Sequence, residues 1–213
     1  MTHTLHRQGT LENLKEDWVI LCMPSKDINH VNSAPKLKRF FEICLQNNCV
    51  TFGDCRSGNE FYQGSKEAVV NNVEDRAVIT ATFSSEDDVV NVLAQLKKED
   101  LGMSVVVSGL EDRTKECCKR AGLEPHTIEH SLGVWGKTEK LPPKEILEIS
   151  TMCGHAMVSV NLIYDMIKKV KKGRMTPEEA AQELFKPCMC GIFNTKRAAS
   201  LIRKIVEKEQ ENA

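Results

Sequence analysis

The chain has 213 residues, of which 41% are hydrophobic, and this suffices for one large domain or two small ones with ordinary cores. Its 29 basic and 30 acidic side chains nearly cancel and are spread evenly, so no nucleic-acid-binding surface is expected. No apolar run approaches the roughly 18 residues of a membrane-spanning helix, and the N-terminus lacks the layout of a signal peptide. We therefore expect a cytoplasmic protein that does not bind membranes.

The first two thirds of the chain alternate between short apolar runs and amphipathic stretches, which is typical of α/β layers. Strands are predicted at residues 18–23, 49–52, 77–83, 103–110 and 126–136. Helices are predicted from Ser33 and from Ser85, each serving as an N-cap, and at residues 65–73 and 111–122. This part of the chain should form a sheet covered by helices.

The pattern changes after Pro142 and Pro143, beyond which we predict helices and no strand. Thr176 can cap one of these helices in a capping box with Glu179, and the last helix should begin near Thr195. The predicted fold class is therefore α/β, with a layered α/β domain at residues 1–141 and a helical, cysteine-containing domain at residues 142–213.

Nine cysteines are a large number for a chain expected in a reducing compartment, where disulfides are rare. Cys22 lies within a predicted strand and Cys44 on the apolar face of a predicted helix, so both are expected in the core. Cys117 and Cys118 are adjacent on a helix and point in different directions, so they should not clamp one metal ion.

Three further cysteines lie at predicted helix ends near the C-terminus. Cys153 belongs to the stretch TMCGHAM, and Cys188 and Cys190 belong to the stretch FKPCMCGIFN. Cys153 and Cys190 are each followed by glycine, which allows tight turns and a close approach of backbone N–H groups to sulfur. We predict that these three cysteines together bind a metal ion or an iron–sulfur cluster.

The fourth ligand is left open by the sequence. His155 would complete a Cys3His zinc site of Cys153, His155, Cys188 and Cys190, or a histidine-ligated cluster. Without His155, a [4Fe–4S] cluster on three cysteines would keep one iron open, and Cys55 could serve as a ligand if its glycine-rich loop meets the C-terminal part. The long separation between the two cysteine stretches and the apolar residues around them favour the cluster over zinc.

The C-terminal third resembles a family of uncharacterised proteins from anaerobic bacteria and archaea. The resemblance rests on the CGH sequence at 153–155, the TPEEAA run from Thr176 and the PCxCGIFN run from Pro187. The resemblance implies that the protein binds a metal or a cluster of the kind found in anaerobes. It does not indicate which reaction, if any, the protein catalyses.

We therefore expect an iron–sulfur protein that acts in redox chemistry or in metalloenzyme maturation, with a redox or metalloenzyme protein as its partner. The alternative is a zinc-stabilised Cys3His interaction module without chemistry of its own. A thiol-redox protein with a reversible Cys188–Cys190 disulfide ranks third. The substrate and the oligomeric state are open at this point.

Overall fold

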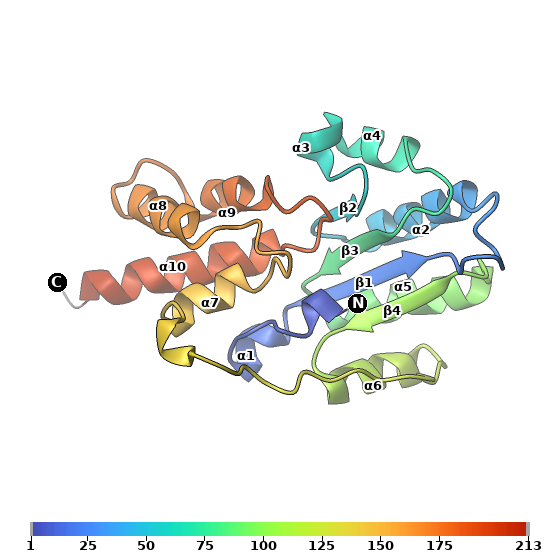
Figure 1. The fold of residues 1–213 in the computed structure, drawn as a ribbon, viewed down its shortest axis with the longest axis horizontal. Coiled ribbons are helices and arrows are strands. Elements are labelled where there is room, and N and C mark those ends of the chain that lie inside the picture. Colours follow the sequence, from blue (N-terminus) through green and yellow to red (C-terminus); the bar gives the residue numbers. More distant parts are fainter. Residues whose placement is uncertain (1, 212–213) are drawn as a thin grey trace.

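The computed structural model describes residues 2–211 and has the mixed α/β architecture that the sequence predicts (Figure 1). One antiparallel sheet has the strand order β2-β3-β1-β4. The strands are β1 (Trp18–Met23), β2 (Phe52–Asp54), β3 (Ile79–Phe83) and β4 (Ser104–Ser108). The α-helices are α1 (Leu11–Leu14), α2 (Ala34–Gln46), α3 (Glu60–Gln63), α4 (Lys66–Asn71), α5 (Glu86–Glu99), α6 (Glu111–Arg120), α7 (Lys144–Ser150), α8 (Val160–Lys171), α9 (Pro177–Phe185) and α10 (Thr195–Glu211). Two short 3-10 helices are η1 (Thr2–Thr4) and η2 (Thr138–Lys140).

Alternating side chains give the sheet two different faces. On β3, Ile79, Ala81 and Phe83 enter a core shared with α2 and α5, whereas Thr80 and Thr82 point to the opposite face. Both threonines are fully buried, and their hydroxyl groups hydrogen-bond to backbone or side-chain atoms there. Backbone from another part of the chain therefore packs on this second face and hydrogen-bonds to it.

A second hydrophobic core is built mainly by helices α7 to α10, which lie together beyond one end of the sheet (Figure 1). The predicted boundary at residue 141 falls after Leu123, which packs on the first core, and before Ile146, which is buried in the second. The segment before β1 joins the two parts, because Asp17 is ion-paired to Arg197 of α10.

Two predictions about local structure are wrong, and the strand predicted at 49–52 is displaced to Phe52–Asp54. Residues 126–136 form no strand: Leu132 and Trp135 are exposed, and Gly133 and Gly136 have positive φ angles that break an extended run. Ser33 makes no side-chain cap for α2, because the Asp75 carboxylate accepts the backbone N–H groups of Asn32 and Ala34 instead.

The capping box of α9 is confirmed. Thr176 Oγ1 accepts the Glu179 N–H, and the Glu179 carboxylate accepts the Thr176 N–H. Thr176→Ala should therefore lower the free energy of unfolding by about 1 kcal/mol, as measured by urea denaturation. Thr176→Ser keeps the hydroxyl group and should stay close to wild type, so equal losses in both variants would contradict this role of the cap.

None of the helices within residues 2–211 combines the length and the apolar composition needed to cross a bilayer.

Candidate functional site

Four cysteines from three separate segments meet between the sheet and the C-terminal helices. Cys153 follows α7, Cys188 and Cys190 lie between α9 and α10, and Cys55 follows β2. The Cys188 thiol interacts with the thiols of Cys153 and Cys190, and Cys190 also interacts with Cys55. These interactions link the sulfurs in the order Cys153, Cys188, Cys190, Cys55, a connected set called the row below, which brings together the three predicted cysteines and the conditional fourth one.

The site is sheltered from solvent. Cys153, Cys188 and Cys190 are at most 3% exposed, and Cys55 is half-buried. The remaining five cysteines are also free thiols; Cys22, Cys44, Cys117 and Cys118 are buried in the sheet core as single apolar groups, and Cys49 packs at its margin.

The turn that carries Cys188 and Cys190 is pressed against the sheet, as the segment between α9 and α10 shows in Figure 1. Gly191 has a φ angle of +85°, and a Cβ atom there would lie 2.3 Å from the backbone nitrogen of Gly53. Thr80 donates a hydrogen bond to the Cys190 carbonyl. The glycines at 53 and 191 thus permit a backbone-to-backbone contact that fixes Cys190 beside the loop of Cys55.

Asn59 holds the same turn from the other side. Its buried Nδ2 lies 3.0 Å from the Cys188 carbonyl and 3.3 Å from the carbonyls of Phe185 and Lys186. Its Oδ1 accepts the Phe61 N–H and caps α3. The position of Cys188 is therefore coupled to the segment that follows Cys55.

The turn at Cys153 is closed by the N-terminal segment. A Cβ atom on Gly154 would lie 1.9 Å from the His3 carbonyl oxygen, so this contact requires glycine. Interactions with the backbone N–H groups of Met157, Val158 and His155 help to lower the pKa of the Cys153 thiol. Such N–H to sulfur hydrogen bonds are a common way of stabilising bound thiolates in proteins.

Arg7 links both cysteine turns. Its guanidinium donates to the carbonyl of Met152, at 3.1 Å, and to the carbonyl of Ile192. It is also ion-paired to Asp17, whose side chain is fully buried. One positive side chain thus connects the residue before Cys153 with the turn that follows Cys190.

The hydrogen bonds between the sulfurs divide the four cysteines into two kinds. Hydrogen bonding by Cys188 lowers the pKa of Cys153 to about 6, against an opposing effect of burial, and hydrogen bonds from Cys188 and Cys55 strongly lower the pKa of Cys190. The pKa values of Cys188 and Cys55 are raised by the same contacts and by burial. In the sheet core, burial raises the pKa of Cys22 to about 12. The thiolate, the form that binds metals, is therefore favoured at Cys153 and Cys190, whereas the thiol is favoured at Cys188, at Cys55 and at Cys22 in the core.

The four cysteine sulfurs are spread over a greater distance than the ligand sphere of one metal ion. Among the described His, Cys, Asp and Glu side chains, one set of three has all its ligand atoms within 4.8 Å of one another, and this set is His3, His155 and Cys190. No three of the four cysteine sulfurs meet that limit in the described part of the chain. His155 Nδ1 lies 3.6 Å from Cys190 Sγ, so the predicted histidine does reach the site, beside one of its cysteines.

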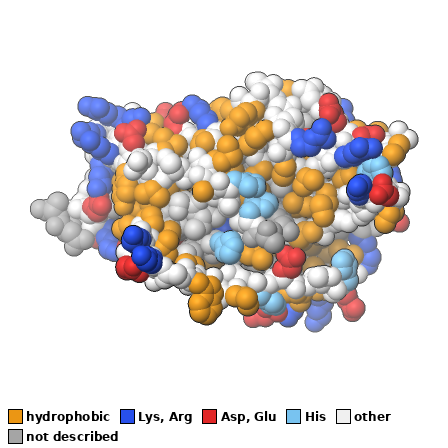
Figure 2. Space-filling model, viewed as in Figure 1, with side chains coloured by type: hydrophobic (Ala, Val, Ile, Leu, Met, Phe, Trp, Pro, Cys, Tyr) orange, Lys and Arg blue, Asp and Glu red, His pale blue; other side chains and the backbone are white. Residues whose placement is uncertain are grey.

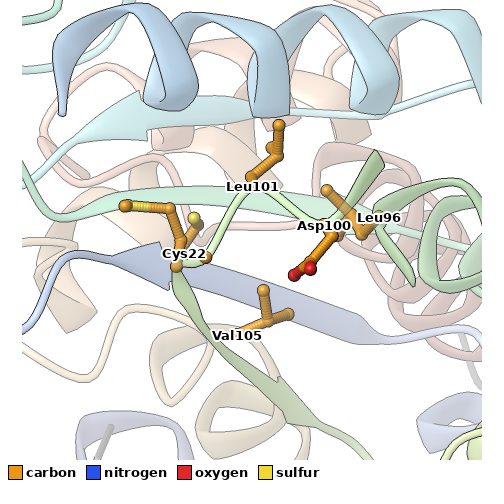
Figure 3. Close-up of a pocket in the computed structure, with 7 residues that line it drawn as sticks. Cys22, Leu96, Asp100, Leu101 and Val105 are labelled. Atoms are coloured by element: carbon orange, nitrogen blue, oxygen red, sulfur yellow. The ribbon is translucent and has the colours of Figure 1, made fainter. Parts of the chain in front are cut away.

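A small cavity lies elsewhere, at the end of β1 in the sheet core (Figure 3). It has a volume of about 90 Å³ and is lined mainly by apolar side chains, including Cys22, Leu96 and Val105, with the Asp100 carboxylate beside it. Binding pockets for small molecules are usually several times larger. The cysteine row is the stronger candidate for function.

Sequence reasoning missed His3, Arg7 and Asn59. The first two lie in an N-terminal segment without apolar periodicity, and Asn59 lies in a stretch predicted as a loop. The signal that could have pointed to Asn59 is its place four residues after Cys55, just before the short α3.

Comparison of the chain with family models, with curated proteins and with solved structures gives no match.

Proposed function

We propose that Cys55, Cys153, Cys188 and Cys190 bind an iron–sulfur cluster of the [4Fe–4S] type, and that the protein acts in redox chemistry or in metalloenzyme maturation. The observation that carries the proposal is the row of four interacting cysteine sulfurs drawn from three segments of the chain. Four cysteine thiolates are the usual ligand set of such a cluster.

The spacing of the sulfurs supports a cluster over a single zinc ion. Zinc–sulfur bonds of about 2.3 Å in a tetrahedron place every pair of sulfurs about 3.8 Å apart. Three or more ligand atoms within 4.8 Å would then be expected among the cysteines, and the set that meets this limit instead contains two histidines and one cysteine. A cubane of four irons binds each thiolate at a separate corner, so it does not require the sulfurs to lie within the ligand sphere of one ion.

The surroundings also suit a cluster. Apolar side chains of the second core, including Met152, Ile192 and Phe193, are fully buried beside the cysteines and would exclude water. The N–H groups at Cys153 would offset the negative charge of its thiolate. When bound, the cluster would supply one-electron transfer, and the half-buried Cys55 would be the edge nearest to a protein partner.

Cys55 gives the sharpest test of the ligand set. After anaerobic reconstitution with ferrous iron and sulfide, wild type should hold about four irons per chain. Cys55→Ala should lose the iron that Cys55 binds, giving about three irons per chain and a changed EPR spectrum. Cys49→Ala is the matched control, because Cys49 is also half-buried in this part of the chain and its thiol donates to the Thr51 carbonyl.

Equal iron content and equal spectra in Cys55→Ala and wild type would contradict the four-cysteine set. They would favour a cluster held by three cysteines with an open iron.

A further inference from the structure

His3 and His155 come from distant parts of the chain and lie face to face beside Cys190. Their ring centroids are 4.4 Å apart and the rings are inclined by 27°. One nitrogen of each ring and the Cys190 sulfur lie within 4.8 Å of one another, and His155 Nδ1 is 3.6 Å from that sulfur. The size of this group matches the ligand sphere of one metal ion.

The arrangement is held by the backbone. The His3 carbonyl is packed against Gly154, where no Cβ atom would fit, and Cys153 and His155 flank that glycine. The two rings are therefore positioned by the same contact that closes the Cys153 turn. They do not depend on long, flexible side chains for their proximity.

Hydrogen bonding alone does not account for both rings. Hydrogen bonding to the Cys190 sulfur would explain one nitrogen of each ring, but His3 Nε2 is buried and has no hydrogen-bond partner. A buried ring nitrogen without a partner costs free energy, and a metal ion bound to that nitrogen would remove the cost.

We propose that His3, His155 and the Cys190 thiolate bind one borderline-soft divalent metal ion, with Zn²⁺ as the best fit to two imidazole nitrogens and one thiolate. This second site rests on the proposed function in one respect, because Cys190 would bridge the ion and the cluster. Three protein ligands leave a fourth position for water or a substrate, which is the arrangement of catalytic rather than structural zinc sites.

The proposed ion would be reachable from solvent. His155 is exposed and His3 is half-buried. Figure 2 shows histidine side chains near the centre of one face of the molecule, next to hydrophobic ones. An open metal position there could bind a small anionic or carbonyl-containing ligand as a Lewis acid.

The test is zinc binding by the anaerobically reconstituted full-length protein, with Zn²⁺ alone as the probe and a chromophoric chelator as the competitor. Wild type should bind one Zn²⁺ per chain in addition to its iron and sulfide. His3→Ala and His155→Ala should each weaken zinc binding by at least about 100-fold, since even outer-shell changes cost 10–100-fold, while iron and sulfide stay unchanged. His126→Ala is the control. His126 is an exposed histidine outside the proposed site, so this variant should bind zinc as wild type does.

Zinc affinity unchanged in both His3→Ala and His155→Ala would overturn the second site, as would the absence of zinc binding at micromolar free Zn²⁺. A third result would also overturn it: wild type contains one zinc and no iron, and both Cys153→Ala and His155→Ala lose that zinc. One mixed zinc site would then replace both centres. Histidine-dependent zinc binding that survives in Cys153→Ala, again with no iron in wild type, would support the second site and reject the cluster.

Discussion

Replacing Cys188 with alanine should reduce the iron and sulfide of the anaerobically purified protein to background. Cys188 is fully buried and occupies the middle of the row, where it interacts with both Cys153 and Cys190. Its loss removes one ligand and also the hydrogen bonds that favour the thiolate at its two neighbours. Iron and sulfide analysis on the purified variant measures the effect directly.

Cys117→Ala is the matched control, because Cys117 is equally buried but belongs to the sheet core. Burial raises the pKa of Cys117 to about 12, which disfavours the thiolate. This variant should keep its full iron content. Iron retained in Cys188→Ala, or lost equally in both variants, would contradict the assignment of the site.

Asp17→Ala should destabilise the protein by about 3–5 kcal/mol, the usual effect of removing one partner from a buried ion pair. The Asp17 side chain is fully buried and is paired with Arg7 and with Arg197, whose Nη1 lies 2.6 Å from Asp17 Oδ2. Burial already lowers the pKa of Arg197, which is the direction expected for a charge removed from water. Without Asp17, two guanidinium groups would stay in the interior with reduced compensation.

Urea denaturation of Asp17→Ala measures this loss, and Glu178→Ala provides the comparison. Glu178 pairs with Arg203 on the surface, where both side chains are about half exposed or more. The surface variant should change the free energy of unfolding by less than about 1 kcal/mol. A similarly small change in Asp17→Ala would show that the buried network does not hold the N-terminal segment in place.

Much of the fold follows from local patterns in the sequence. The apolar and β-branched run at 77–83 predicts the strand β3, and the capping box at Thr176 fixes where α9 begins. The predicted strand at 126–136 fails because local composition does not reveal whether a sheet edge is available. The cap of α2 fails for a related reason, since Asp75 reaches it from 41 residues away in sequence.

The candidate site could be predicted in part. The glycines after Cys153 and Cys190 pointed to tight, ligand-bearing turns, whereas the meeting of Cys55 with Cys190 depends on how the sheet packs against the C-terminal helices. The roles of His3 and Arg7 depend on the path of the N-terminal segment over both cysteine turns. No spacing in the sequence records that path, because the two Arg7 contacts join residues 145 and 185 positions apart.

The most direct measurement is a visible absorption spectrum of the anaerobically purified wild-type protein, with iron, sulfide and zinc analysis on the same sample. We predict a brown protein with broad charge-transfer absorption and about four irons and four sulfides per chain. A colourless protein with about one zinc and no iron would contradict the cluster.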